Sequence, residues 1–134
     1  MATDIAKQGP KPVVRNKKAV CSSSHPLVTQ TMLQVMRDGG SAVDAGIAGS
    51  LLQAVVEPHM THHAGTVSFL YWEAATGKTY HLNSAGTLVS GLEPFRPVPA
   101  IGGMFSLPGQ EPCACIPGFM PGLQAIHERF GTMS

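Results

Sequence analysis

The sequence is poor in charged side chains. Only 13% of its 134 residues are Asp, Glu, Lys or Arg, which is about half the share found in an ordinary soluble domain. A surface with so few charges favours a chain whose faces are largely covered by another polypeptide. The alternative is a free-standing glycine-rich domain of low solubility, since the chain holds 15 glycines.

Neither a strong charge of one sign nor a long apolar run is present. The formal net charge is +1, so nothing draws the chain as a whole to nucleic acid or to acidic lipids. No apolar run approaches the roughly 18 residues of a membrane span, and no signal-peptide pattern opens the sequence. We therefore expect a soluble, cytoplasmic chain that binds neither nucleic acid nor a membrane.

Cysteine is scarce and poorly spaced for cross-links. The residues are Cys21, Cys113 and Cys115, an odd count whose close pair is C-x-C. Such a pair rarely closes a relaxed disulfide, and no second pair completes a zinc site. We expect free thiols, no metal and no cofactor.

The chain divides into an arm and one folded segment. The basic run between Lys7 and Lys18 contains two prolines and no hydrophobic periodicity, so residues 1–18 are predicted to form a flexible arm. Residues 19–134 are predicted to form a single segment, which includes a proline- and glycine-rich connection over residues 91–118. Connections of this length are usually functional or disordered.

Local signals place a strand and two helices early in the chain. Ala19-Val20-Cys21 is typical of a short strand, after which Pro26 suits the first turn of a helix. Gly39-Gly40 permits the left-handed conformation that closes such a helix. Ser41 followed by Asp44 resembles a capping box, so a second helix should start there.

The second helix is predicted to carry two different faces and to stop before Pro58. One face is apolar and recurs every four residues, at Val43, Ile47, Leu51 and Val55. Another face is nearly devoid of side chains, at Ala42, Ala45, Gly46 and Gly49. A helix with such a face can approach a sheet or another helix closely.

A hairpin and a final helix are predicted farther along the chain. Residues 66–73 and 78–82 carry β-branched and aromatic side chains at period two, on either side of Ala74-Ala75-Thr76-Gly77. Both strand faces carry apolar groups, which fits a sheet lying between layers of helices. Residues 119–130 repeat apolar side chains at helical spacing, and Gly131 is expected to cap the helix.

Four landmarks follow one another over residues 20–134. In order they are His25-Pro26-Leu27, Gly39-Gly40-Ser41-Ala42-Val43-Asp44-Ala45, Val55-Val56-Glu57-Pro58-His59, and Ile116-Pro117-Gly118 with Phe130-Gly131-Thr132. Together they resemble the first part of the large subunit in the gamma-glutamyltransferase family of N-terminal-nucleophile hydrolases. The resemblance implies a mixed α/β (α+β) fold, in which this chain is part of a four-layer αββα sandwich. It also implies a precursor that cuts itself into two subunits.

The family's nucleophile is a threonine at the start of the small subunit, outside this chain. Its hydroxyl attacks the amide, its own α-amino group is the base, and backbone N–H groups hold the oxyanion. The resemblance therefore implies that this chain holds no catalytic residue, is inactive alone and lines the acyl pocket of an amide-bond hydrolase or acyltransferase. The implied partners are a small-subunit chain with an N-terminal threonine, a further large-subunit segment beyond Ser134, and a small-molecule amide.

The resemblance also assigns roles to the loop after the second helix. Ala64-Gly65 aligns with paired glycines of the family and is implied to supply backbone donors to the oxyanion. His62 and His63 would then face the substrate, and the alternative is that they are loop histidines without a catalytic role. A metal site within residues 57–63 is a further alternative, but helical zinc sites place histidines four apart, and Pro58 breaks any helix here.

A second stretch bears on specificity. Asn83-Ser84-Ala85-Gly86-Thr87 aligns with a family stretch whose Arg binds the α-carboxylate of a gamma-glutamyl group. Ala85 stands at the Arg position, and a methyl group makes no bidentate contact with a carboxylate. The pattern is closer to the amidohydrolase and acylase branches of the family, in which Ser84 or Thr87 would bind a neutral or smaller polar group. The alternative is a plain strand end followed by a turn.

Two other functions stay open. One is a catalytically inactive binding or regulatory module derived from the family, and the other is a small metalloprotein. Cys21, Ser23 and His25 lie close enough in sequence to pair as nucleophile and base, but no third group is placed to orient them.

Overall fold

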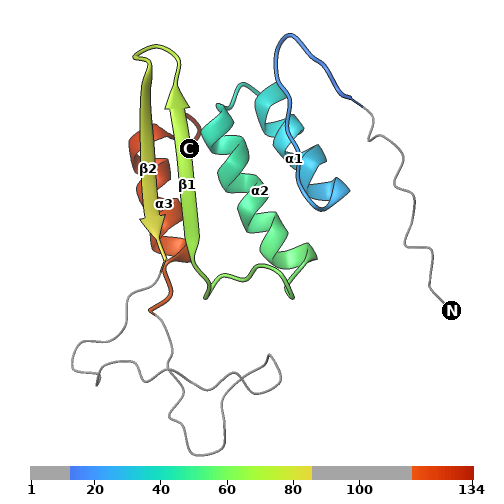
Figure 1. Cartoon of the computed structure of the whole chain (residues 1–134). Helices are drawn as coiled ribbons and strands as arrows, with labels where there is room; N and C mark the ends of the chain where they lie inside the picture. The colour runs from blue at the N-terminus through green and yellow to red at the C-terminus, as the bar shows by residue number, and fades with distance from the viewer. Residues whose placement is uncertain (1–12, 86–115) are drawn as a thin grey trace, which may run out of the picture.

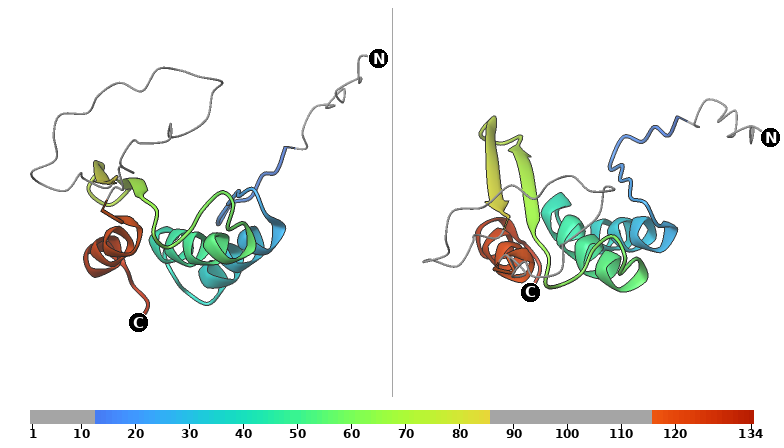
Figure 2. Two further views of the ribbon diagram at one scale, coloured as in Figure 1. Left: turned by 90° about the horizontal axis from the view of Figure 1, so that it is seen from below. Right: turned by 60° about the horizontal axis from the view of Figure 1, so that its bottom comes forward.

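The structure is a computed structural model that describes residues 13–85 and 116–134 (Figure 1). Its elements, in chain order, are α1 (Pro26–Arg37), α2 (Ala42–Val56), β1 (Val67–Glu73), β2 (Lys78–Ser84) and α3 (Phe119–Phe130). Seen from below, the three helices lie in one layer and the hairpin lies on one side of that layer (Figure 2). The predicted mixture of helix and strand is confirmed. Residues 13–18, the described part of the predicted arm, form neither helix nor strand.

Helix α1 begins and ends where the sequence predicts. His25 is the N-cap, and its Nδ1 accepts a hydrogen bond from the Leu27 backbone N–H at 3.2 Å. Gly39 follows the helix with φ +97°, the left-handed conformation that glycine adopts without strain. The predicted strand at Ala19-Val20-Cys21 is wrong: these residues pair with no other strand in the described part of the chain. An extended segment becomes a strand only when a second strand accepts its backbone hydrogen bonds.

The predicted capping box opens α2. Ser41 Oγ accepts from the Asp44 N–H at 3.1 Å, and Asp44 Oδ2 accepts from the Ser41 N–H at 2.7 Å. The helix ends at Val56, before Pro58. Its small-residue face is in use, because a Cβ added at Gly49 would lie 2.8 Å from Met32 Cγ on α1.

The apolar stripe of α2 is correct at its start and wrong at its end. Val43 is buried, and Ile47 and Leu51 pack against the core, but 65% of Val55 is exposed. Four residues turn an α-helix by about 40° more than one full turn, so three such steps rotate a side chain by about 120°. Val55 has therefore left the face on which Val43 lies.

Strands β1 and β2 form the predicted antiparallel hairpin, the one sheet in the described residues. Its register runs from Val67 opposite Ser84 to Glu73 opposite Lys78, and Gly77 takes φ +66° in the turn. Alternate side chains of β1 face the helices, while 73% of Leu70 and 62% of Trp72 are exposed on the other face. Helices thus cover one face of the hairpin within the described ranges, and the other apolar face is uncovered there.

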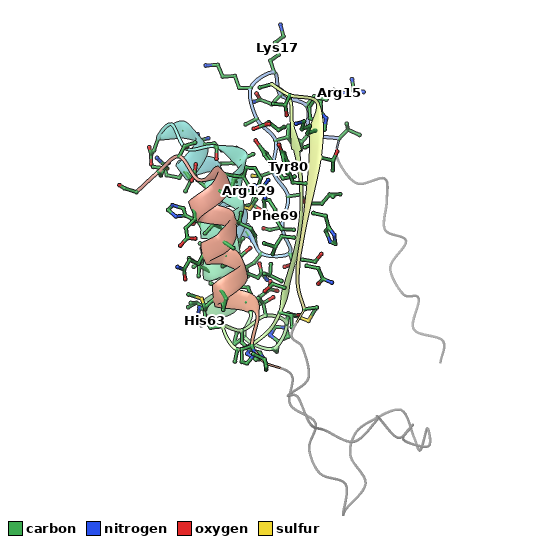
Figure 3. The ribbon with its side chains drawn as sticks, turned by 90° about the vertical axis from the view of Figure 1, so that its left-hand side faces the viewer. Arg15, Lys17, His63, Phe69, Tyr80 and Arg129 are labelled. Carbon is green, nitrogen blue, oxygen red and sulfur yellow. The ribbon has the colours of Figure 1, made fainter. Side chains whose placement is uncertain are left out.

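The core lies between α2, α3 and the hairpin. Its buried residues are Val43, Phe119, Leu123 and Ile126. Figure 3 shows Phe69 pointing from the hairpin toward the helices, where it packs against this core. Helix α3 spans the predicted residues, and Gly131 is its C-cap. Of the helices described, none is long and apolar enough to cross a bilayer.

Candidate functional site

The predicted site residues that the structure describes lie on two chain segments, which meet at the first turn of α3. The first segment is the turn at residues 62–65, which precedes β1. Its Gly65 carbonyl accepts hydrogen bonds from the N–H groups of Gly118 at 3.0 Å and Phe119 at 2.9 Å. Those N–H groups have no partner inside the helix, so the turn satisfies the open end of α3. The second segment is the end of β2, which contacts Gly118 from another side.

The backbone N–H groups of Ala64 and Gly65 differ in whether they are hydrogen-bonded. The Gly65 N–H donates to the His62 carbonyl at 2.9 Å, so in this conformation it is engaged inside the turn. The Ala64 N–H has no acceptor among the residues the structure describes, and Ala64 is exposed. Of the pair expected to donate to an oxyanion, Ala64 is therefore the one whose N–H is available here.

Both predicted histidines are exposed on this turn. The His63 ring meets the Phe119 ring edge-on, with centroids 6.0 Å apart and planes at 72°. Figure 3 shows His63 at the beginning of α3, with Arg129 and Tyr80 toward its other end. Phe119 is buried, so its ring supports His63 from below while the imidazole stays open to solvent. No aromatic ring of residues 13–85 or 116–134 packs against His62 in this way.

Ser84 and Ala85 end the hairpin beside the same turn of α3. Ser84 is half-buried, and its Oγ donates to the Gly118 carbonyl at 2.7 Å. Ala85 is exposed, and its N–H donates to Asn83 Oδ1 at 3.0 Å. The structure thus joins Ser84 to the 62–65 turn through Gly118. Thr87 lies outside the described residues.

Sequence reasoning gave Gly118 no role in the site. A Cβ built there would lie 2.0 Å from the Ser84 carbonyl oxygen, and one at Gly122 would lie 2.5 Å from Val67 Cγ1. Glycine therefore lets the first turn of α3 pack directly against the backbone of Ser84 at the end of β2 and against the side chain of Val67 at the start of β1. The only local signal was the Pro117-Gly118 pair before a helix, which marks a helix start but not a contact with Ser84 34 residues away.

The side chains of the histidine-rich stretch after α2 do not form a metal-binding cluster with other described residues. Within residues 13–85 and 116–134, no three His, Cys, Asp or Glu side chains are grouped so that they could hold a metal ion. Glu57 instead accepts from Ser24 Oγ at 2.6 Å and from the Gln53 amide, and these hydrogen bonds hold the pKa of its carboxyl below the ordinary value. Glu57 thereby joins the start of α1 to the end of α2.

Among the residues that the structure describes, no base is hydrogen-bonded to the alternative nucleophiles near the N-terminus, Cys21 and Ser23. Ser23 Oγ donates to the His25 carbonyl at 2.9 Å and lies 2.6 Å from Thr29 Oγ1. The His25 Nδ1 accepts from the Leu27 N–H. His25 therefore caps α1, and Ser23 is hydrogen-bonded to the first turns of the same helix. Cys21 is a free thiol in the structure, whereas Cys113 and Cys115 lie outside the described residues.

Comparison with known proteins matches residues 28–134 to the family model for gamma-glutamyltranspeptidase. The chain is 30% identical over 112 residues to the capsule biosynthesis protein CapD proenzyme of Bacillus anthracis, a match that covers 84% of this chain and 18% of that protein. It is 31% identical over 124 residues to the glutathione hydrolase-like YwrD proenzyme of Bacillus subtilis, covering 92% of this chain and 23% of that protein. The chain thus spans about a fifth of the length of these relatives.

Solved structures show the same fold. The gamma-glutamyltranspeptidase of Helicobacter pylori matches with a TM-score of 0.74 at 25% identity, covering 92% of this chain and 36% of that one. The transpeptidase CapD of Bacillus anthracis matches with a TM-score of 0.69 at 26% identity, covering 89% and 35%. The helix layer and the hairpin described above are therefore part of the family's N-terminal-nucleophile hydrolase sandwich. On sequence and on structure alike, the chain belongs to the gamma-glutamyltranspeptidase family.

Proposed function

We propose that this chain is part of the large subunit of an amide-bond hydrolase or acyltransferase, in which it shapes the acyl pocket for a threonine at the N-terminus of another chain. The observation that carries the proposal is the family match over residues 28–134. The relatives are a hydrolase-like proenzyme and a transpeptidase by name. Because the chain spans about a fifth of these relatives, the proposal assigns the reacting groups to other segments.

In this proposal the threonine hydroxyl attacks the substrate carbonyl, and its own α-amino group takes the proton. The chain's contribution is the wall of the acyl pocket, from the 62–65 turn to Ala85. The available Ala64 N–H is the candidate donor to the oxyanion, and the exposed imidazoles of His62 and His63 flank it. A preorganised backbone donor stabilises the charge that develops on the carbonyl oxygen.

The acyl group is proposed to be neutral or small rather than gamma-glutamyl. Ala85 is exposed at the end of β2 and carries only a methyl group. A carboxylate bound against it would lose water without gaining a cation, which is costly. The assignment to the amidohydrolase and acylase branches therefore stays a prediction from the residue at position 85. A role for Thr87 stays a prediction from the resemblance to the family.

The partner is proposed to cover the outer face of the hairpin, defined here by Ser68, Leu70, Trp72, Thr79, His81 and Asn83. These residues carry no Asp, Glu, Lys or Arg, and Leu70 and Trp72 are largely exposed. A two-stranded sheet alone is marginally stable in water, and exposed apolar faces of this kind mark contact surfaces. The match covers 36% of the Helicobacter pylori chain, so most of that chain lies outside the matched part. A cytoplasmic location stays a prediction from the sequence.

Activity of the assembled protein tests the proposal. The complete enzyme should hydrolyse an acyl anilide, and replacing the N-terminal threonine of the partner chain with alanine should abolish turnover. Cys21→Ala and Ser23→Ala in this chain should leave the rate unchanged, because neither residue is hydrogen-bonded to a base within residues 13–85 and 116–134. Turnover that is lost in either of these two variants would place the nucleophile in this chain and overturn the proposal. A catalytically inactive binding module would show no turnover in any form.

A further inference from the structure

We infer that Ser84 is a positioning residue: through its hydrogen bond to Gly118 it fixes the 62–65 turn and the Ala85 position relative to each other. The inference rests on the proposed function, because it concerns the two segments that are proposed to wall the acyl pocket. It differs from the sequence-based interpretation of Ser84 as a residue that contacts the substrate.

The Gly118 peptide group joins both segments. Its carbonyl accepts from Ser84 Oγ at 2.7 Å and from the Gly122 N–H at 2.9 Å. Its N–H donates to the Gly65 carbonyl at 3.0 Å. One residue at the start of α3 is therefore bonded to the end of β2 and to the turn before β1, and a displacement of either segment is passed to the other.

Gly118 and Gly122 pack against Ser84 without free space between them. A Cβ at Gly118 would lie 2.0 Å from the Ser84 carbonyl oxygen, and a Cβ at Gly122 would lie 2.8 Å from Ser84 Cβ. Real Cβ atoms do not approach heavy atoms so closely, so only glycine fits at either position. Packing this tight transmits displacement rather than absorbing it.

The single hydroxyl proton of Ser84 distinguishes a positioning role from a role as a hydrogen-bond donor to the substrate. A serine hydroxyl has one proton to donate, and here it is given to the Gly118 carbonyl. Ser84 therefore has no donor left for a substrate while this bond is made. In the inference, Ser84 acts on the reaction through the placement of the 62–65 turn and of Ala85. A misplacement of about 1 Å at a reacting centre can lower a rate by about 100-fold.

The test uses the complete enzyme and two acyl anilides, one with an apolar and one with a polar neutral acyl group. The burst of acyl-enzyme formation counts the active sites, so kcat refers to folded, processed enzyme. Ser84→Ala should lower kcat about tenfold or more on both substrates with little change in KM, and Ser84→Cys, which keeps a weak donor, should fall in between. Ser50→Ala is the matched control, since Ser50 Oγ also donates to a backbone carbonyl, that of Gly46 at 2.8 Å, and its kcat should be unchanged.

Gly118→Ala provides an independent arm. It should lower kcat in the same way, and the double variant should be no slower than the slower single variant, because both changes break one contact. An unchanged kcat in Ser84→Ala, or a KM that rises only for the polar acyl group, would overturn the positioning role. Absence of turnover in the unsubstituted complete enzyme would instead remove the proposed function itself, and with it this inference.

Discussion

At the residue scale, Asp44 joins the start of α2 to the chain that leaves α3. Its carboxylate accepts from the Thr132 N–H at 2.9 Å, from Thr132 Oγ1 at 2.6 Å and from the Ser41 N–H at 2.7 Å. Burial raises the pKa of the Asp44 carboxyl, but the hydrogen bonds from Thr132 and Ser41 outweigh it, and the pKa lies well below its ordinary value. The capping box predicted the bond to Ser41, whereas nothing local indicated Thr132.

Replacing Asp44 should therefore lower stability in a pH-dependent way. Because the folded-state pKa lies below the unfolded-state value of about 3.9, the ionised carboxylate stabilises the fold above that pH, and this contribution is lost as the pH falls below it. Asp44→Asn should lower the free energy of unfolding by about 1.5–3 kcal/mol near neutral pH, as measured by urea unfolding of the complete protein. The difference should narrow in acid.

Asp38→Asn is the matched control, because Asp38 is exposed and accepts from Gln34 Nε2 on the helix surface. Its effect should stay within about 0.5 kcal/mol. An Asp44→Asn difference that is equal near neutral pH and in strong acid would show that ionisation of Asp44 does not stabilise the fold.

Specificity is also decided at the residue scale, at Ala85. Introducing Ala85→Arg should raise the rate ratio of a gamma-glutamyl anilide over a simple acyl anilide. One charged hydrogen bond contributes roughly 1.5–3 kcal/mol, which corresponds to a gain of about tenfold to a hundredfold in kcat/KM. Ala85→Gln adds similar bulk without the charge and should give no such gain. If the unsubstituted enzyme already prefers gamma-glutamyl amides strongly, another cation serves this role and the assignment of Ala85 to the pocket is wrong.

At the element scale, α2 carries two glycines with different surroundings. A Cβ at Gly46 would lie 3.9 Å from the Phe69 ring, whereas a Cβ at Gly49 would lie 2.8 Å and 2.9 Å from atoms of Met32. Alanine is favoured over glycine inside a helix by about 1 kcal/mol at either position. Gly46→Ala should therefore stabilise the protein, and Gly49→Ala should be less stable than Gly46→Ala by about 1–3 kcal/mol through overpacking.

Urea unfolding of the two variants gives this comparison directly. Adding Met32→Ala to Gly49→Ala should recover part of the loss, since it removes the side chain that the new methyl group meets. Equal stability of Gly46→Ala and Gly49→Ala would mean that α1 and α2 do not pack through Gly49.

Helices and turns could be predicted where residues close in sequence determine them. The candidate site could not be predicted in this way, because it depends on contacts between residues far apart in the sequence. Pro26 marks a helix start through its fixed φ, Ser41 through hydrogen bonds to Asp44, and Gly77 forms a turn through its positive φ. The strand expected at residues 19–21 failed because pairing depends on a distant partner. The Ser84–Gly118 hydrogen bond joins residues 34 positions apart in the sequence. Hydrophobic periodicity and capping residues are local signals, so they do not predict it. The segments that meet there were identified only through the family resemblance.

At the scale of the whole molecule, the outer face of the hairpin is proposed to meet the rest of the enzyme. Leu70→Lys should weaken association of this chain with its partner about tenfold or more, because a charge would be buried in an apolar contact. Ala74→Lys, in the exposed turn of the hairpin, is the matched control and should associate normally. Sedimentation or titration calorimetry measures both. Unchanged association of Leu70→Lys would show that the partner does not cover this face.

The central claim is that this chain is part of a large subunit and that the nucleophilic threonine begins another chain. Intact mass spectrometry with N-terminal sequencing of the purified complex tests this claim most directly. The expected result is a second polypeptide, bound to this one, whose first residue is threonine with a free α-amino group, as the nucleophile and base of the proposed reaction require. A stable, monodisperse protein of this chain alone, with no threonine-initiated partner, would contradict the proposed role as part of a large subunit. It would favour the catalytically inactive binding module instead.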